Sequence, residues 1–83
     1  MKHIVVYKFK KIEPKTRLQF NRELYGFIDY SNKGKYHYHR EGILSKDDYE
    51  KLSRGVLLIK KKLNAVLEHL KRYNADYKVF KIS

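Results

Sequence analysis

The chain contains no cysteine, no tryptophan and only one proline in its 83 residues. Without cysteine it has no disulfide framework, no thiol nucleophile and no cysteine-based metal site. It also lacks long hydrophobic runs: no apolar segment near the N-terminus has signal-peptide length, and no stretch approaches the length that spans a membrane. No nucleotide-binding loop or nucleophile elbow is present either. We therefore expect a cytoplasmic protein without a cofactor and without a membrane partner.

Acidic residues are scarce, because nine Asp and Glu stand against twenty Lys and Arg, for a net charge of +11. Such an excess destabilises the compact state by self-repulsion, and a polyanionic partner relieves it. Half of the positive residues lie in residues 1–41, so the chain has no detachable basic tail. Binding must then use the folded surface. The alternative is a lysine-rich surface that reflects base composition or a hot habitat.

What the chain does contain is enough apolar material for a folded core. Hydrophobic residues make up 42% of the sequence and aromatic residues 14%, which excludes a disordered chain. A length of 83 residues predicts one domain, residues 1–83, near the lower limit for a self-sufficient core.

Alternation and β-branched composition predict strands at residues 3–11, 25–31, 35–41, 56–59 and 76–82. Helical spacing and capping signals predict helices at residues 14–24, 46–53 and 60–73. Pro14 suits the first turn of the first helix, and Gly26 lies just beyond its end. Ser45 and Asp48 resemble a capping box at the start of the short second helix. In the third helix the apolar face comprises Leu63, Val66, Leu67, Leu70 and Tyr73. We expect His69 on its outer face.

The resulting element order, β-α-β-β-(short α)-β-α-β, contains two βαβ units, residues 3–31 and 56–82. This order predicts an α+β fold that resembles the two-layer ferredoxin-like sandwich, with an antiparallel-rich sheet and both main helices on one face. The strand at residues 35–41 is then an extra antiparallel edge strand. The likeness rests on element order alone, since the chain carries no family motif.

The segment from Tyr30 to Arg40 alternates tyrosine with histidine after a turn signal. A three-residue loop at residues 32–34 would pair Asp29 with His37 and place the tyrosines together on a half-buried apolar face. A two-residue loop would instead set the histidines beside Ile28 and Tyr30. The first register sorts apolar from polar residues better, so we expect it.

Aromatic rings, histidines and fixed positive charges in one hairpin predict a surface for RNA or single-stranded DNA. The expected contact residues are Lys33, Lys35, His37, His39, Arg40, Lys60, Lys61 and Lys62. Three lysines at a helix start also oppose the helix dipole, so we expect some compensation there. A bound anion is one option, and a solvated charge run is the commoner one. The chain lacks the basic-aromatic consensus of the RNA recognition motif.

Two other functions compete with simple binding. In a metal-independent ribonuclease, His37 and His39 would serve as general base and acid, with Asp29 orienting the His37 ring. The same three residues could hold a metal ion, but two histidines at this spacing are weak support, and we expect no metal site. In the other alternative the protein is a homo-oligomer that pairs through an exposed edge strand. Binding without catalysis is the reading that the sequence favours.

Overall fold

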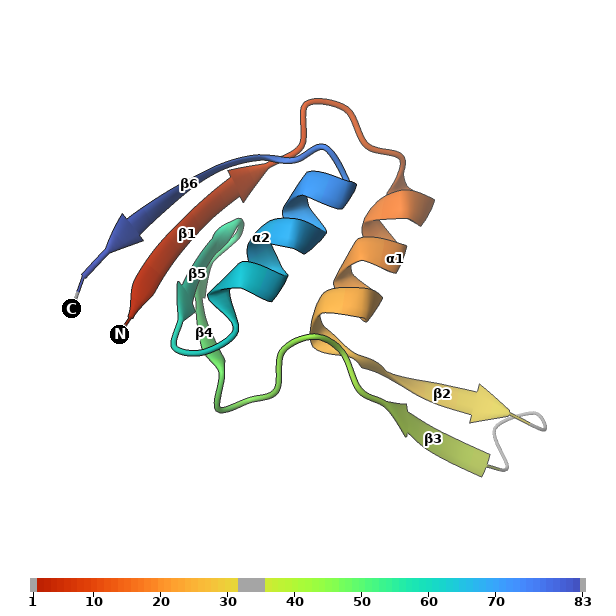
Figure 1. The fold of residues 1–83 in the computed structure, drawn as a ribbon. Helices are drawn as coiled ribbons and strands as arrows, with labels where there is room; N and C mark the ends of the chain where they lie inside the picture. Colours follow the sequence, from red (N-terminus) through yellow and green to blue (C-terminus); the bar gives the residue numbers. More distant parts are fainter. Residues whose placement is uncertain (1, 32–35, 83) are drawn as a thin grey trace.

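The structure is a computed structural model. It describes the backbone of residues 2–31 and 36–82, and the side chains of all of these except residues 29–31, 36 and 37. Within these ranges the chain forms two helices and six strands (Figure 1). They are β1 (His3–Lys8), α1 (Pro14–Tyr25), β2 (Phe27–Ser31), β3 (Tyr36–Arg40), β4 (Tyr49–Ser53), β5 (Val56–Ile59), α2 (Leu63–Arg72) and β6 (Asp76–Lys81). The predicted α+β class is confirmed.

Four strands form the main sheet in the order β4-β5-β1-β6, and every neighbouring pair is antiparallel. The central strand is β1, in which Val5 is the partner of Leu57 on one side and of Val79 on the other. Because β5 and β6 both oppose β1, they run parallel to each other, with α2 between them in the chain. The predicted βαβ unit at residues 56–82 is therefore confirmed, with β1 inserted between its strands.

The other predicted βαβ unit, residues 3–31, is wrong. After α1 the chain does not return to the main sheet, because β2 pairs with β3 in a separate two-stranded sheet. The strand that returns is β4, which runs parallel to β1 with β5 between them. The β3 segment is accordingly not an edge strand of the main sheet.

The short helix predicted at residues 46–53 is also wrong, since residues 49–53 form strand β4. The capping signal is real but local: the Ser45 amide donates to the Asp48 carboxylate and the Asp48 amide to the Ser45 carbonyl, each at 3.0 Å. These bonds close a single turn. The chain then pairs with β5, and Tyr49 is the partner of Ile59. Long-range pairing outweighs a weak local helix preference.

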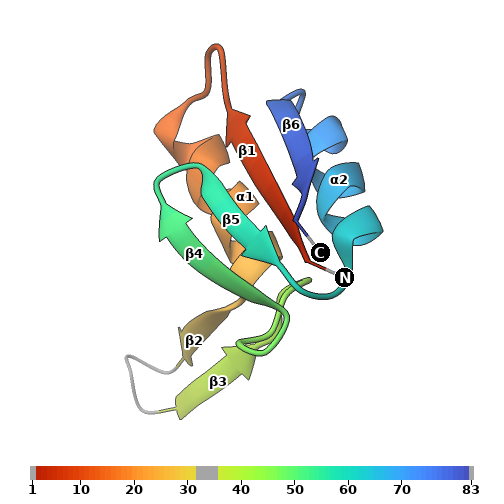
Figure 2. The ribbon, with the colours of Figure 1, turned by 90° about the vertical axis from the view of Figure 1, so that its left-hand side faces the viewer.

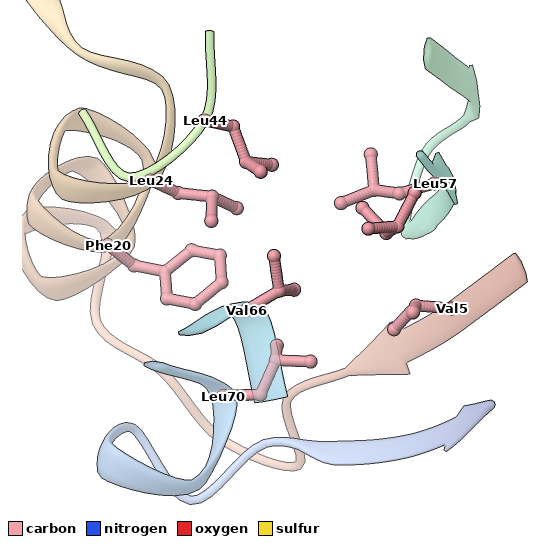
Figure 3. Close-up of a cluster of buried hydrophobic side chains, with 8 residues drawn as sticks. Val5, Phe20, Leu24, Leu44, Leu57, Val66 and Leu70 are labelled. Carbon is pink, nitrogen blue, oxygen red and sulfur yellow. The ribbon is translucent and has the colours of Figure 1, made fainter. Parts of the chain in front are cut away.

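Both helices cover one face of the main sheet, and the core lies between the two layers (Figures 1 and 2). The buried apolar side chains of the described residues are Val5, Phe20, Leu24, Leu44, Leu57, Ile59, Val66 and Leu70 (Figure 3). The α2 residues that were predicted to face the core do so. In α1, Phe20 and Leu24 are buried, whereas Leu18 is 52% exposed.

His69 is the clearest error of side-chain placement, because it is buried rather than on the outer face of α2. Its Nε2 lies 3.1 Å from the Phe20 carbonyl oxygen, and its ring stacks on the Phe20 ring at 4.6 Å. A carbonyl only accepts hydrogen bonds, so the ring carries its proton on Nε2. His69 lies three residues after Val66 and four before Tyr73, on the same helical face as both.

Neither of the two helices in the described ranges covers the opposite face of the main sheet (Figure 2). Strand alternation and the register place Ile4, Val6, Val56, Leu58 and Phe80 on this face. Val6 is 38% and Phe80 51% exposed. We call these five residues the open sheet face.

Candidate nucleic-acid interface

The β2–β3 hairpin projects from the body of the molecule, and we call it the arm (Figure 1). Its register pairs Ile28 with His39, Tyr30 with His37 and Asp29 with Tyr38. The predicted register is therefore wrong by one residue, and the observed pairs are those of the two-residue-loop alternative. The predicted turn at residues 32–34, with Lys33, and the neighbouring Lys35 lie outside the described residues.

The register explains why the arm stays outside the core. It divides apolar and polar residues between both faces of the hairpin, so neither face is apolar enough to be buried. Ile28 and Tyr38, on opposite faces, are 53% and 52% exposed. The expected face that gathers the tyrosines is wrong, because the observed register sets Tyr30 on the face opposite that of Tyr36 and Tyr38. Asp29 is the cross-strand partner of Tyr38, so this register does not form the Asp29–His37 pair on which the catalytic hypothesis depended.

Two glycines fix the point where the arm leaves the body. A Cβ at Gly26 would lie 2.4 Å from the Arg40 carbonyl oxygen, and one at Gly42 would lie 2.2 Å from the Gly26 nitrogen. Gly26 also has φ of 82°, a left-handed value that other residues disfavour. The two chain segments can approach this closely only because neither glycine has a side chain. We call this crossing the neck of the arm.

Beyond the neck, the returning chain is tied to the end of α1. The amides of Ile43 and Leu44 donate to the carbonyls of Glu23 and Leu24, each at 2.9 Å. These bonds satisfy carbonyls at the C-terminus of α1 that have no partner within the helix. Together with the burial of Leu44, they hold the root of the arm against the body.

Asp48 joins the loop between the arm and β4 to the start of α2. Its Oδ2 accepts from the Ser45 amide and hydroxyl and lies 3.0 Å from Lys62 Nζ. Its carbonyl oxygen accepts from the amides of Lys60 and Lys61, at 2.7 and 3.2 Å. The Ser45 amide and the Lys62 ammonium lower the pKa of Asp48 from 3.8 to about 2. The carboxylate is therefore ionised at neutral pH.

The three lysines before α2 thus differ in role. Lys62 adopts a left-handed backbone conformation, with φ of 65°, and directs its ammonium to Asp48 and to the Ile43 carbonyl. Its charge is compensated within the protein, as the unfavourable helix dipole led us to expect. Lys60 and Lys61 are exposed. Among the described side chains no carboxylate forms an ion pair with either of them, so Lys60 and Lys61 are the predicted contacts of this group with uncompensated charge.

A cleft of about 600 Å³ opens at the neck, and we call it the neck cleft. It collects residues from α1, from the arm, from the connecting loop, from β4 and from the residue before α2. They are Tyr25, His39, Glu41, Gly42, Leu44, Ser45, Lys46, Tyr49 and Lys62. The fold therefore joins two predicted contact residues, His39 and Lys62, that lie 23 positions apart in the sequence.

One wall of the neck cleft is aromatic. The rings of Tyr25 and Tyr49 contact each other, with centroids 5.2 Å apart and planes inclined by 38°. Burial raises the pKa of the Tyr25 phenol, and the neighbouring Tyr7 phenol adds to the shift, so Tyr25 stays protonated at physiological pH. Exposed Lys46 adds a positive charge at the rim. Sequence reasoning missed these three residues because no local motif connects them.

The remaining predicted contacts are placed as follows. Arg40 ends the arm at the neck and is exposed. The backbone of His37 lies in β3, while its side chain is outside the description. Among residues with described side chains, no three His, Asp or Glu gather to hold a metal ion. The described part of the chain also has no helix that is long and apolar enough to cross a membrane.

Comparison of the chain with protein-family models, with curated proteins and with solved structures found no match. Function must therefore be argued from the site itself.

Proposed function

We propose that this protein binds nucleic acid through the arm and the neck cleft, with a preference for unpaired strands of RNA or DNA. The observation that carries the proposal is the neck cleft, which joins an aromatic wall to exposed Lys46 at the root of an exposed arm, with Glu41 as the acidic residue of its lining. The net charge of +11 supports a polyanionic partner for this surface.

The chemistry of the cleft suits an unpaired base better than a duplex. A base stacked on a tyrosine ring typically contributes about 1–3 kcal/mol, and stacking requires a base that is free of its own helix. Tyr49 and Tyr25 offer such a wall, and His39 offers a third ring. Lys46 at the rim is positioned to contact the phosphate that follows the base. Sequence preference is then weak, because every base has a stackable face.

The strand order supports a finer fold assignment as part of this proposal. We infer from the order β4-β5-β1-β6, with two helices on one face (Figure 1), a ferredoxin-like sandwich in which the arm is an insertion between α1 and β4. The scaffold would then supply rigidity, and the insertion would supply the contact surface. Among its five residues the open sheet face offers one aromatic ring, Phe80, whereas the neck cleft joins the rings of Tyr25 and Tyr49 to Lys46, which favours the arm side as the binding surface.

A charge-reversal pair tests the proposal. Lys46→Glu alters the cleft, and Lys15→Glu makes the same charge change at the far end of α1, on another exposed lysine. Binding of a labelled single-stranded RNA, followed by fluorescence anisotropy, should weaken at least about tenfold more for Lys46→Glu than for Lys15→Glu. If the two variants weaken binding equally, the RNA does not bind specifically in the neck cleft, and the proposal is rejected.

The open sheet face favours a second candidate function, weak self-association. Its apolar side chains, with Phe80 half exposed, would gain from burial against a second copy. Because each copy carries +11, this association should strengthen as salt screens the repulsion. Sedimentation at rising salt tests it, with Phe80→Glu as the variant that should stay monomeric. A wild type that is monomeric at high salt and high concentration rejects this candidate.

A further inference from the structure

A second pocket, of about 400 Å³, lies at the opposite end of β4 from the neck cleft, between β1, α1 and the β4–β5 turn. None of the contact residues predicted from sequence lines it. Its lining includes four positive residues, Lys8, Arg17, Lys51 and Arg54, and none of the described residues that line it is acidic. We call it the basic pocket.

Three of these four positive residues are directed to the pocket by the fold. Lys51 is the cross-strand partner of the fully buried Leu57, so it lies on the sheet face that the helices cover. Arg17 lies three residues before buried Phe20 on α1 and so shares its face. Lys8, by contrast, ends β1 as the cross-strand partner of Asp76 on β6.

The third directed residue is Arg54, and a tight turn sets its position. Gly55 has φ of 75°, and its carbonyl accepts a 2.8 Å hydrogen bond from the Tyr7 amide. A Cβ at Gly55 would lie 2.6 Å from the Tyr7 carbonyl oxygen. The turn is therefore held directly against the end of β1, and Arg54 stands beside Arg17 and Lys51 in the pocket lining.

Positive groups gathered without a carboxylate in the lining repel one another, and an anion of matching charge would relieve this repulsion. Phe9 and Tyr7 add an apolar side to the lining, and their rings pack with Phe20 of the core. A volume of about 400 Å³ is in the range of small-ligand sites. A terminal phosphate carries close to two negative charges, whereas a backbone phosphodiester carries one.

We propose that the basic pocket binds the terminal phosphate of a nucleic-acid strand, through Arg17, Lys51 and Arg54. The inference rests on the proposed function and adds the recognition of a strand end to it. Arginine and lysine favour this ligand because charge-assisted hydrogen bonds to phosphate are strong, and the arginine fork can make two at once. The terminal nucleoside lies against Phe9 and Tyr7.

The test uses one RNA decamer in three forms, with a 5′-phosphate, with a 3′-phosphate and with no terminal phosphate. Calorimetric titration of the wild type should show that at least one phosphorylated form binds about tenfold more tightly than the unphosphorylated form, the effect of a single charge-assisted hydrogen bond. The double variant Lys51→Gln/Arg54→Gln should lose this preference while keeping its affinity for the unphosphorylated RNA within about threefold. The control Lys15→Gln should keep the preference.

Each result decides between the two proposals. Equal binding of all three RNA forms by the wild type overturns the terminal-phosphate inference and leaves the proposed function standing. A preference that survives in the double variant also overturns the inference, because the phosphate is then bound elsewhere. No binding of any form rejects the proposed function together with the inference. Thermal melting of the double variant, within a few degrees of the wild type, shows that the substitutions leave the fold intact.

Discussion

The neck of the arm makes a sharp prediction for Gly42→Ala. The new Cβ would lie 2.2 Å from the Gly26 nitrogen, 2.6 Å from the Tyr25 carbonyl carbon and 2.7 Å from the Leu24 carbonyl oxygen. All three neighbours are backbone atoms, so no side chain can turn aside. The strain is relieved only if the segment after Gly42 moves away from the end of α1.

That movement also stretches the hydrogen bonds from the Ile43 and Leu44 amides to the end of α1. Overpacking costs about 1–3 kcal/mol, and each lost hydrogen bond about 0.5–1.5 kcal/mol. The free energy of unfolding should therefore fall by about 2–6 kcal/mol. For a domain of this size each kcal/mol lowers the melting temperature by about 4–8 °C, so Gly42→Ala should melt at least about 8 °C lower.

Thermal unfolding followed by circular dichroism at neutral pH measures the effect. Glu41→Ala, at the adjacent exposed position, is the control and should change the free energy of unfolding by no more than about 0.5 kcal/mol. If Gly42→Ala melts within the range of this control, the close contact with Gly26 does not exist, and the described root of the arm is incorrect.

Two further predictions concern Asp48 and the arm histidines. The pKa of Asp48 is lowered from 3.8 to about 2, so the stability that its carboxylate contributes is fully present above pH 3.8 and is lost as the pH falls to about 2. When the melting temperature is measured over this pH interval, Asp48→Asn should lose less than the wild type. An identical acid profile in variant and wild type would contradict the role of Asp48 in holding the loop to α2. The double variant His37→Ala/His39→Ala should bind RNA within about tenfold of the wild type, and the wild type should leave labelled RNA uncut in the presence of a chelator. Cleavage that disappears in the double variant would instead establish the ribonuclease alternative.

The elements that could be predicted from sequence are those with strong local signals. The apolar run 56–59 forms β5 as predicted, and Pro14 and Gly26 mark the ends of α1. The predicted core face of α2 is buried or packed on the core. In each case the residues that decide the structure are close together in the chain.

The errors arise where contacts between residues distant in the sequence determine the structure. Residues 49–53 follow a capping signal, yet they become a strand because β5 offers them a partner. The hairpin register was inferred on the assumption of a half-buried hairpin, and the arm has exposed residues such as Ile28 and Tyr38 on both faces. Sorting apolar from polar residues cannot fix the register of such a hairpin.

In the candidate site, too, local signals could be predicted from the sequence and long-range contacts could not. His39 and Lys62 were both predicted from local composition, but their meeting in the neck cleft depends on how the arm joins the body. The aromatic wall of Tyr25 and Tyr49 comes from a helix end and a strand start. The basic pocket likewise combines α1 with the β4–β5 turn. The spacing of these residues in the sequence does not predict that they meet.

Nucleic-acid binding by this surface is tested most directly by the salt dependence of affinity. The measurement is the dissociation constant of the wild type for a labelled single-stranded RNA, at a series of salt concentrations from low to physiological. Binding that neutralises several phosphates should give a log–log slope of several units, with affinity falling steeply as salt rises. Affinity that is absent at low salt, or that does not change across the series, would contradict the account.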